Sequence, residues 1–402
     1  MIRIIFMVIN MNIGGTEKAL LSMIREMDRT KWDITILMLE EYGGFLNEIP
    51  DWVSVKYVYE YKSLKSYFNE SPLSVLKKNV TEHKYLESII IAILYFITKI
   101  TGNLSYYYRY IFKNIKTLDK NYDIAVAYAG PMDFITYFVA NKIKSDKKVQ
   151  WIHFNIEKIH FNKRLASKLY KRFDKIFVVS KDGLGKFIKS FPKVMDKTQV
   201  FYNILDHEKI NRLADNGDSF KDDFHGIRIL TVGRLSKEKG QDLTIPVLAR
   251  LKSEGYKVRW YCVGEGGARS EYETMINKFK IEKDYVLLGS RLNPYPYMKD
   301  CDIYVQSSRH EGYCITLAEA RCFNNPIITT NFTGATEQII NEENGIIVSE
   351  DADSIYLGIK KLLDNKKLYK YIRENLNSNT VDTTVEIEKI SKVIVKKSEK
   401  IV

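Results

Sequence analysis

A strand pattern followed by a glycine turn and a helix opens each half of this sequence. Residues 2–9 are a nearly continuous run of β-branched and other apolar residues, followed by Gly14-Gly15 and a helical spacing over 17–27. The same order returns in the second half, where a predicted strand over 227–232 is followed by Gly233 and then by a predicted helix over 241–252. Such runs are typical of strands buried on both faces of a parallel sheet. We therefore predict an α/β chain with two Rossmann-like domains.

Further strands are predicted in both halves by short apolar runs bounded by turn residues. They cover 33–39, 122–128, 149–154 and 175–179, and then 258–263, 286–288, 303–306, 327–330 and 346–348.

Three other segments set the predicted organisation of the chain. Residues 55–120 are rich in tyrosine and lysine and indicate helices with weak boundaries. The polar segment 206–226 is interpreted as a connection, which gives domains of 1–205 and 206–402. An amphipathic helix over 386–395 could cross back onto the first domain.

The positive charge of the chain is concentrated in one segment. The sequence carries 62 Lys and Arg against 50 Asp and Glu, a net charge of +12, and residues 141–200 hold 16 basic and 5 acidic side chains. A local basic surface indicates an anionic membrane or a phosphorylated small molecule. Nucleic acid is disfavoured, because no helix–turn–helix, zinc-finger or RNP signature is present. Residues 158–197 are interpreted either as a solvated face or as a surface for anionic lipid headgroups.

The longest uncharged apolar run, residues 89–97, is too short for a membrane span, which takes about 20 apolar residues. A buried core helix is the favoured interpretation, and a helix lying in the membrane interface is the alternative. The N-terminus shows no signal-peptide pattern. We expect a cytoplasmic location, with peripheral binding to the inner face of the cell membrane left open.

The four cysteines are interpreted as free thiols. Cys262, Cys301, Cys314 and Cys322 form no CxxC pair and no zinc spacing with histidine. The sequence therefore implies neither a disulfide framework nor a structural zinc site.

The loop after the predicted strand 227–232 carries two cations. Arg234 and Lys239 lie five residues apart across a tight turn, so both heads can converge on one anion. Arginine presents a fork that matches phosphate, and lysine a mobile point charge, so a diphosphate is the expected guest. A solvated turn with scattered charges is the alternative.

A second loop follows the predicted strand 303–306. Glu311 falls in this loop and Glu319 in the next helix, so two hydroxyl-bearing parts of one ligand could contact both. The backbone N–H groups of Tyr313, Cys314 and Ile315 at the start of that helix are predicted to form an anion site.

Taken together, the two loops resemble the retaining GT-B glycosyltransferases of family 4, which share an E-x7-E motif. Glu311 and Glu319 have this spacing. The resemblance spans essentially the whole chain and is sharpest over 227–350. Further matching segments are 14–17, 151–153, 178–180, 202–203, 263–266, 286–289 and 326–345. Residues 305–346 are most similar to bacterial enzymes that assemble capsular and other surface polysaccharides.

This resemblance implies a GT-B fold of two Rossmann-like domains facing an interdomain cleft, the first binding the acceptor and the second the nucleotide sugar. It implies a hexosyltransferase that moves a sugar from a nucleoside diphosphate, expected to be a UDP-sugar, to a saccharide acceptor with retention of configuration. We expect a lipid-linked acceptor, no cofactor and no metal, since the nucleotide sugar is a substrate. A nucleotide-sugar epimerase and a non-catalytic binding partner at the membrane are the alternatives.

Residue roles follow from the same resemblance. The candidate catalytic residues are Arg234, Lys239, Glu311 and His153. Glu311 is implied to bind a hydroxyl of the transferred sugar, and His153 to face its reactive side. The candidate donor-binding residues are Gly15, Gly233, Arg234, Lys239, Gly264, Gly312, Tyr313, Cys314, Ile315 and Glu319.

The resemblance implies specific roles for two of the donor-binding residues. Glu319 is implied to bind the ribose hydroxyls, and Gly15 to let the backbone approach the donor without a Cβ. The family often has glycine at position 314, so the Cys314 side chain is expected to narrow the space beside the phosphates.

Two D-x-D sequences, 300–302 and 351–353, match the metal motif of the other glycosyltransferase fold. Asp302 precedes a predicted strand, away from the carboxyl end at which we expect the ligand. Asp351 and Asp353 are typical of a helix N-cap region. We therefore disfavour a metal site at either motif.

Overall fold

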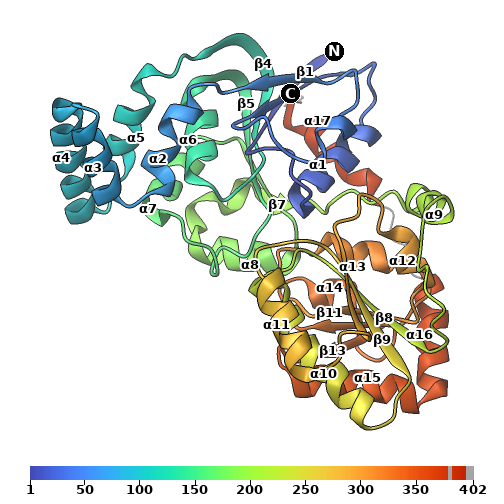
Figure 1. Ribbon diagram of the computed structural model, residues 1–402. Coiled ribbons are helices and arrows are strands. Elements are labelled where there is room, and N and C mark those ends of the chain that lie inside the picture. The colour runs from blue at the N-terminus through green and yellow to red at the C-terminus, as the bar shows by residue number, and fades with distance from the viewer. Residues whose placement is uncertain (379–382, 395–402) are drawn as a thin grey trace. The chain divides into compact units, whose positions relative to one another are not determined.

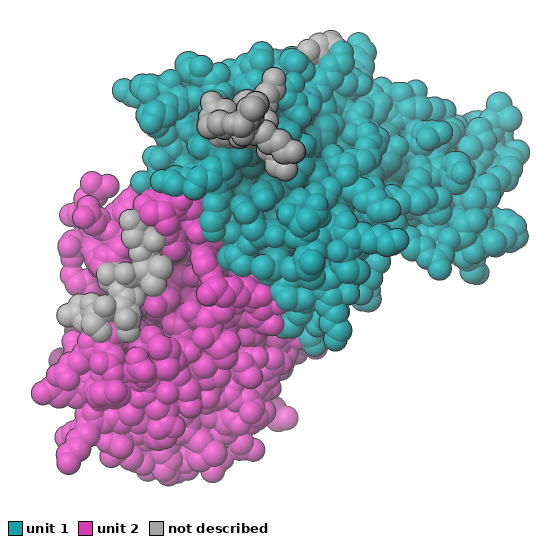
Figure 2. Space-filling model, turned by 180° about the vertical axis from the view of Figure 1, so that it is seen from behind, with its two compact units in different colours: residues 1–179, 184–201, 387–402 teal, residues 180–183, 202–386 magenta. Residues whose placement is uncertain are grey.

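Strands and helices alternate through both halves of this computed structural model, which describes residues 1–378 and 383–394 (Figure 1). The chain divides into two units (Figure 2). Unit 1 holds residues 1–179, 184–201 and the chain from 387 on, and unit 2 holds residues 180–183 and 202–386.

A parallel sheet of seven strands forms the centre of unit 1, in the order β3-β2-β1-β4-β5-β6-β7. The strands are β1 (Ile2–Val8), β2 (Trp32–Met38), β3 (Ser54–Tyr57), β4 (Leu118–Ala127), β5 (Ile143–Ile152), β6 (Lys175–Val178) and β7 (Thr198–Val200). The consecutive residues Ile4, Ile5, Phe6 and Met7 of β1 are all fully buried. Both faces of this strand are therefore covered, as the apolar run predicts.

Nine helices accompany this sheet among the described residues. They are α1 (Gly15–Glu26), α2 (Tyr61–Asn69), α3 (Pro72–Thr81), α4 (Tyr85–Thr101), α5 (Ser105–Ile111), α6 (Asp133–Lys142), α7 (Lys163–Tyr170), α8 (Lys181–Ser190) and α17 (Glu388–Ile394). Helix α8 begins with the few residues that belong to unit 2. The last helix, α17, lies in unit 1, where the Lys389 ammonium donates to the Val200 carbonyl at 2.9 Å. Val395, at the end of the helix predicted over 386–395, lies outside the described residues.

The favoured interpretation of residues 89–97 is wrong. They belong to α4, a helix in which only Ser88 and Ile91 are buried and most large apolar side chains are exposed. One face of α4 packs on α3, and this covers too little of the helix to bury the rest. No helix among the described residues combines the length and the apolar character that crossing a bilayer requires.

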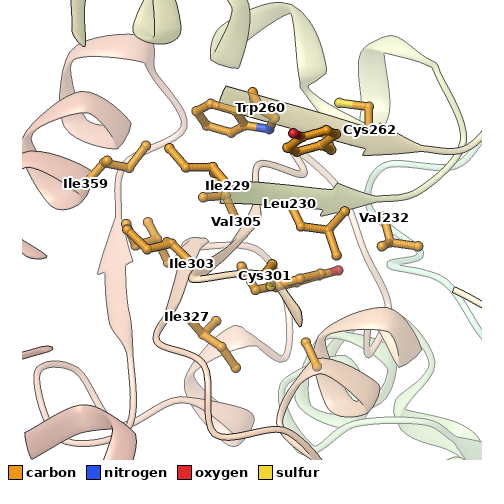
Figure 3. Close-up of a cluster of buried hydrophobic side chains, with 14 of the residues drawn as sticks. Ile229, Leu230, Val232, Trp260, Cys262, Cys301, Ile303, Val305, Ile327 and Ile359 are labelled. Carbon is orange, nitrogen blue, oxygen red and sulfur yellow. The ribbon is translucent and has the colours of Figure 1, made fainter. Parts of the chain in front are cut away.

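Unit 2 has a parallel sheet of six strands in the order β10-β9-β8-β11-β12-β13. The strands are β8 (Ile227–Val232), β9 (Val258–Val263), β10 (Tyr285–Gly289), β11 (Ile303–Gln306), β12 (Ile327–Thr330) and β13 (Ile346–Val348). Figure 3 shows buried side chains of this core, in which Trp260 of β9 lies next to Ile229 of β8, its partner in the sheet. This core fixes the strands, and with them the loops that leave their carboxyl ends.

The helices of unit 2 are α9 (His207–Asp215), α10 (Gln241–Ser253), α11 (Arg269–Phe279), α12 (Tyr295–Asp300), α13 (Ile315–Ala320), α14 (Ala335–Gln338), α15 (Ala352–Asp364) and α16 (Lys366–Ser378). The interpretation of 206–226 as a plain connection misses α9. Its Ile210 and Ala214 are buried in the core of unit 2, and the Asp206 carboxylate caps the helix by accepting the Lys209 N–H at 2.9 Å. The charged residues that made the segment look like a linker belong to an amphipathic helix.

Candidate functional site

The strand order of unit 2 reverses between β8 and β11, which are neighbours in the sheet. Open α/β sheets bind ligands at the carboxyl ends of the strands at such a switch point. The loop 233–240 leaves β8 there, and the loop 307–314 leaves β11. The two loops singled out in the sequence therefore start from the same point of the sheet.

An ion pair joins these two loops. The Lys239 ammonium donates to Glu311 Oε1 at 2.5 Å, and the two side chains are only 21% and 12% exposed. Burial alone would lower the pKa of Lys239, but the charge and hydrogen bond of Glu311 outweigh it and leave that pKa above its usual value. Lys239 is therefore a cation throughout the physiological pH range.

Buried hydroxyl and amide groups orient Glu311. Ser308 Oγ donates to Glu311 Oε1 at 2.7 Å and accepts from Gln306 Nε2 at 2.7 Å. Gln306 Oε1 in turn accepts from the Tyr304 hydroxyl at 2.7 Å. Since Tyr304, Gln306 and Ser308 are at most 1% exposed, this chain of hydrogen bonds holds Glu311 from inside the sheet.

Arg234 occupies a more open position than Lys239. Its side chain is 65% exposed, and it donates to Glu238 Oε2 at 3.1 Å. Its charge opposes the protonation of Lys239, so the two cations lie close enough to interact. Each cation has its own carboxylate partner, Glu238 for Arg234 and Glu311 for Lys239.

Gly240 allows the two loops to touch. Its φ of +69° is left-handed, and a Cβ at this position would lie 2.1 Å from the Ser307 carbonyl oxygen. Ser307 Oγ donates back to the Lys239 carbonyl at 2.9 Å. A side chain at position 240 would separate the loops that carry Lys239 and Glu311.

Sequence reasoning missed the residues that brace these loops. The Arg309 guanidinium binds both carboxylate oxygens of Asp242, at 2.8 and 2.7 Å, and donates to the Lys237 carbonyl at 2.6 Å. Gln241 donates to the Arg234 carbonyl at 3.0 Å. Arg309 and Gln241 lie outside the E-x7-E motif. The sequence gives no signal for the contacts of Arg309, because its partners lie far from it in the chain.

The predicted glycine turn after β9 packs against the first loop. Gly264 has a φ of +153°, and a Cβ there would meet the Gly233 carbonyl oxygen at 2.0 Å. The Leu235 N–H donates to the Glu265 carbonyl at 3.1 Å. A Cβ at Gly233 would lie 3.6 Å from the stem of Lys239, an ordinary contact.

The segment before α13 contains an unusual backbone conformation. Cys314 has φ +59° and ψ +84°, in the left-handed region that favours glycine, and its side chain is 5% exposed. Burial, together with the nearby Glu311 charge, raises the pKa of its thiol to about 12. The thiol is therefore neutral and lies beside the Lys239–Glu311 pair.

The other residues predicted around α13 lie near its start or within it. The Gly312 carbonyl accepts from Ser180 Oγ at 3.0 Å, and Tyr313 packs its ring against Tyr202. Ile315 is the first residue of α13. Glu319 is 2% exposed and accepts a hydrogen bond from the Tyr295 hydroxyl at 3.0 Å.

Gly15 and His153 belong to unit 1. His153 is 6% exposed and packs against Tyr128, with ring centroids 4.5 Å apart. Burial lowers its pKa to about 3, so the imidazole is neutral at physiological pH. Its Nε2 atom is buried and has no hydrogen-bond partner within the described ranges. A Cβ at Gly15 would meet no atom within 4 Å.

Both D-x-D sequences have structural contacts. Asp302 accepts the Arg228 N–H at 2.7 Å, at the amino ends of β11 and β8. Asp351 caps α15 by accepting the Ser354 N–H at 2.7 Å. Within residues 1–378 and 383–394, no group of three or more His, Cys, Asp or Glu side chains is placed to hold a metal ion.

The fold of the chain is the GT-B fold of solved glycosyltransferase structures. HepE of Anabaena, solved in complex with UDP and glucose, matches with a TM-score of 0.69 at 17% identity, over 98% of this chain and 99% of HepE. TarM of Staphylococcus aureus, in a complex that includes UDP, matches with a TM-score of 0.69 at 14% identity, over 98% of this chain and 100% of the TarM chain. Two Rossmann-like α/β units are thereby confirmed.

Residues 221–378 match the family model "Glycosyl transferases group 1". A relative from Campylobacter jejuni is 34% identical over 211 residues and is named N-acetylgalactosamine-N,N'-diacetylbacillosaminyl-diphospho-undecaprenol 4-alpha-N-acetylgalactosaminyltransferase. That match covers 52% of this chain and 56% of the relative. The capsular polysaccharide biosynthesis glycosyltransferase CapM of S. aureus is 29% identical over 36% of this chain and 38% of its own length. The chain thus spans about half the length, or less, of these curated relatives.

Proposed function

We propose that this chain is a hexosyltransferase-type glycosyltransferase that moves a sugar from a nucleoside diphosphate donor, a UDP-sugar, to a saccharide acceptor. The observation that carries this proposal is the largely buried Lys239–Glu311 pair at the switch point of the unit 2 sheet. The family match over 221–378 and the names of the relatives support the reaction class. HepE, whose fold matches, has been solved with UDP-glucose, which supports a UDP-sugar as donor.

The chemistry of the leaving group explains the two cations. As the glycosidic bond breaks, negative charge grows on the departing nucleoside diphosphate. Lys239 and Arg234 stabilise this charge, and removing one such preorganised group typically costs about 3–4 kcal/mol of transition-state stabilisation. These cations supply the positive charge at the phosphates, so the proposal needs no metal or other cofactor.

Glu311 has a second role in this proposal. Lys239 and Ser308 both bind its Oε1 atom, so the carboxylate is held in one orientation. Its Oε2 atom can then accept a hydroxyl of the transferred sugar while Lys239 stays in place. By resemblance, Glu319 binds the ribose hydroxyls. The roles of Gly15 and His153 stay predictions, and Gly15→Ala tests that of Gly15.

The acceptor and the stereochemistry are finer points of the same proposal. The name of the Campylobacter relative includes a diphospho-undecaprenol group, and CapM is named for capsular polysaccharide biosynthesis. These names support a lipid-linked saccharide acceptor in bacterial surface polysaccharide synthesis, at the cytoplasmic face of the membrane. Retention of configuration and membership of family 4 rest on the E-x7-E resemblance.

A thermal-shift panel with UDP-, GDP- and ADP-sugars tests the donor, because stabilisation grows with affinity. We expect the UDP-sugars to raise the melting temperature most. No shift with any nucleotide would contradict the proposal and favour a non-catalytic binding partner. Isomerised sugar formed from the donor alone, without an acceptor, would favour an epimerase.

Lys239→Ala and Glu311→Ala test the roles of the pair. We expect each to reduce transfer by at least about 10²-fold while the protein stays folded. Lys360→Ala is the matched control, since it removes the Lys360–Glu254 ion pair of 2.6 Å elsewhere in unit 2. Full activity in both site variants would refute the assignment.

A further inference from the structure

A continuous apolar stripe covers the outer side of α4. Its members are Leu86, Ile89, Ile90, Ile93, Phe96 and Ile100, which are between 38% and 78% exposed. At about 100° per residue, they fall within roughly 120° of the helix circumference. Ser88 and Ile91, the two buried residues of the helix, lie on the opposite side. We call these six residues the α4 stripe.

All six side chains are exposed, so no other described residue of unit 1 covers them. Figure 1 shows α3 and α4 side by side at the outer edge of unit 1, with α2 and α5 between them and the sheet. The same helices form the teal lobe at the right of Figure 2, where the molecule is turned by 180°. Contiguous exposed apolar surfaces of this kind mark interaction sites.

The segment that contains the stripe is rich in basic side chains. Residues 61–116 carry nine Lys and Arg against three Asp and Glu. The lysines at 77, 78, 84 and 99, on or beside α3 and α4, are exposed. Glu82 and Lys84 form an ion pair of 2.6 Å and offset each other, so the excess positive charge near the stripe comes from Lys77, Lys78 and Lys99. The surface around the apolar stripe is therefore positively charged.

The basic segment of α7 joins this surface at one end of α4. The Arg164 guanidinium donates to the Thr101 carbonyl, the last of α4, at 2.6 Å. Lys163, Arg164 and Lys168 are exposed, while Leu165 and Leu169 of the same helix are buried. Arg164 thus places part of the positive charge of α7 at the carboxyl end of the helix that carries the stripe.

We propose that α3 and α4 dock unit 1 onto an anionic lipid bilayer, with the α4 stripe inserted at the level of the headgroups and upper acyl chains. An aliphatic stripe beside lysines fits this partner, because apolar side chains enter the interface and the lysines remain at the phosphates. The 17 residues of α4 make a helix about 25 Å long, which lies in the interface and does not cross it. Membrane docking goes beyond the proposed transfer reaction and does not depend on it.

Co-sedimentation with lipid vesicles tests this docking. We expect the protein to bind vesicles that contain phosphatidylglycerol at least tenfold more tightly than vesicles of phosphatidylcholine alone. The double variant Ile93→Gln/Phe96→Gln keeps the charge and is expected to lose at least tenfold in binding. The matched control is Leu357→Gln, a substitution of a 61% exposed leucine in α15 of unit 2, which should bind as the unchanged protein does. Equal binding by the double variant and the unchanged protein would overturn the inference.

Fluorescence quenching distinguishes the bilayer from other occupants. With Phe96→Trp, lipids brominated on their acyl chains should quench the added emission, whereas Leu357→Trp should show no such quenching. A dimer in lipid-free solution that Ile93→Gln/Phe96→Gln abolishes would show that a second copy covers the stripe and would overturn the proposal. Absence of quenching at position 96 would overturn it as well.

Discussion

The brace between the two site loops makes a quantitative prediction for Arg309→Lys. Arg309 binds Asp242 through two hydrogen bonds and the Lys237 carbonyl through a third. A lysine is a point charge and can keep only part of this set. Each hydrogen bond to a charged group contributes about 1.5–3 kcal/mol, and both side chains are about a quarter exposed, so we expect a net loss of about 2 kcal/mol. For a unit of this size, that corresponds to a fall of about 4–8 °C in melting temperature.

The assay is thermal unfolding of the variant with and without UDP. Because Arg309 ties the loop 307–314 to residues 237–242, we also expect a smaller stabilisation by UDP in the variant. The control is Arg250→Lys, at an ion pair with Asp353 of 3.0 Å whose side chains are 49% and 86% exposed. We expect that control to change the free energy of unfolding by less than about 1 kcal/mol.

A double-mutant cycle isolates the Arg309–Asp242 contact. Arg309→Lys, Asp242→Asn and the double variant should be non-additive by at least about 1 kcal/mol, because the two residues contact each other directly. If Arg309→Lys destabilises no more than Arg250→Lys does, or if the cycle is additive, the brace contributes nothing and the reasoning fails.

Three further outcomes are expected. Gly15→Ala should reduce transfer without lowering the melting temperature, since a Cβ there meets no protein atom within 4 Å. Gly185→Ala, equally open, should leave transfer unchanged, and unchanged transfer in Gly15→Ala would remove Gly15 from the donor site. Cys314→Gly should be more stable than Cys314→Ala by about 0.5–1 kcal/mol, the reverse of the usual order, because φ +59° strains every residue but glycine; thermal unfolding that ranks alanine above glycine would contradict this. His153 has a pKa of about 3 in the folded protein, below its unfolded value, so only the unfolded state takes up the proton between about pH 6.5 and 3. Between pH 7 and pH 5, the free energy of unfolding of the unchanged protein should therefore fall by about 2 kcal/mol more than that of His153→Gln. Parallel pH profiles of the two proteins in chemical denaturation would rule this out.

The strands of unit 2 could be predicted because each is a short apolar run that must be buried on both faces. Those at 227–232, 258–263, 303–306, 327–330 and 346–348 have the predicted bounds. Parallel strands end at one edge of the sheet, so the position of the loops with Lys239 and Glu311 followed from the strand ends alone.

The contacts of the site could not be predicted in the same way. The sequence predicts that Arg234 and Lys239 converge on one anion, but it does not indicate their carboxylate partners, Glu238 and Glu311. Ser308, Arg309 and Gln241 bind atoms distant in the sequence or backbone carbonyls, and no local pattern indicates such partners. Glycine at position 314 was implied only by the resemblance, and the backbone angle shows why cysteine is costly there.

Apolar composition also failed to predict burial. Residues 89–97 were assigned to the core because their side chains are apolar, yet burial depends on whether a neighbouring element covers the helix. Among the described residues, α3 and α5 are the main neighbours of α4, and only its Ser88 and Ile91 are buried. For α9 the error was the opposite one, because a charged segment was interpreted as a connection and is a packed helix. Two buried side chains, Ile210 and Ala214, suffice to anchor it although most of its other residues are polar.

Unit 1 is assembled from segments that lie far apart in the sequence, and this affects how the chain can fold during synthesis. Ile390 and Val393 of α17 are buried in a unit whose other segments end at Phe201, and 185 residues of unit 2 intervene. At a translation rate of about 5–20 residues per second, the ribosome needs roughly 10–40 s to add them. During this time the apolar surface of unit 1 that Ile390 and Val393 of α17 cover in the folded protein stays exposed. The order of synthesis thus makes unit 2 the first to have all of its strands and helices available, although the chain begins with unit 1.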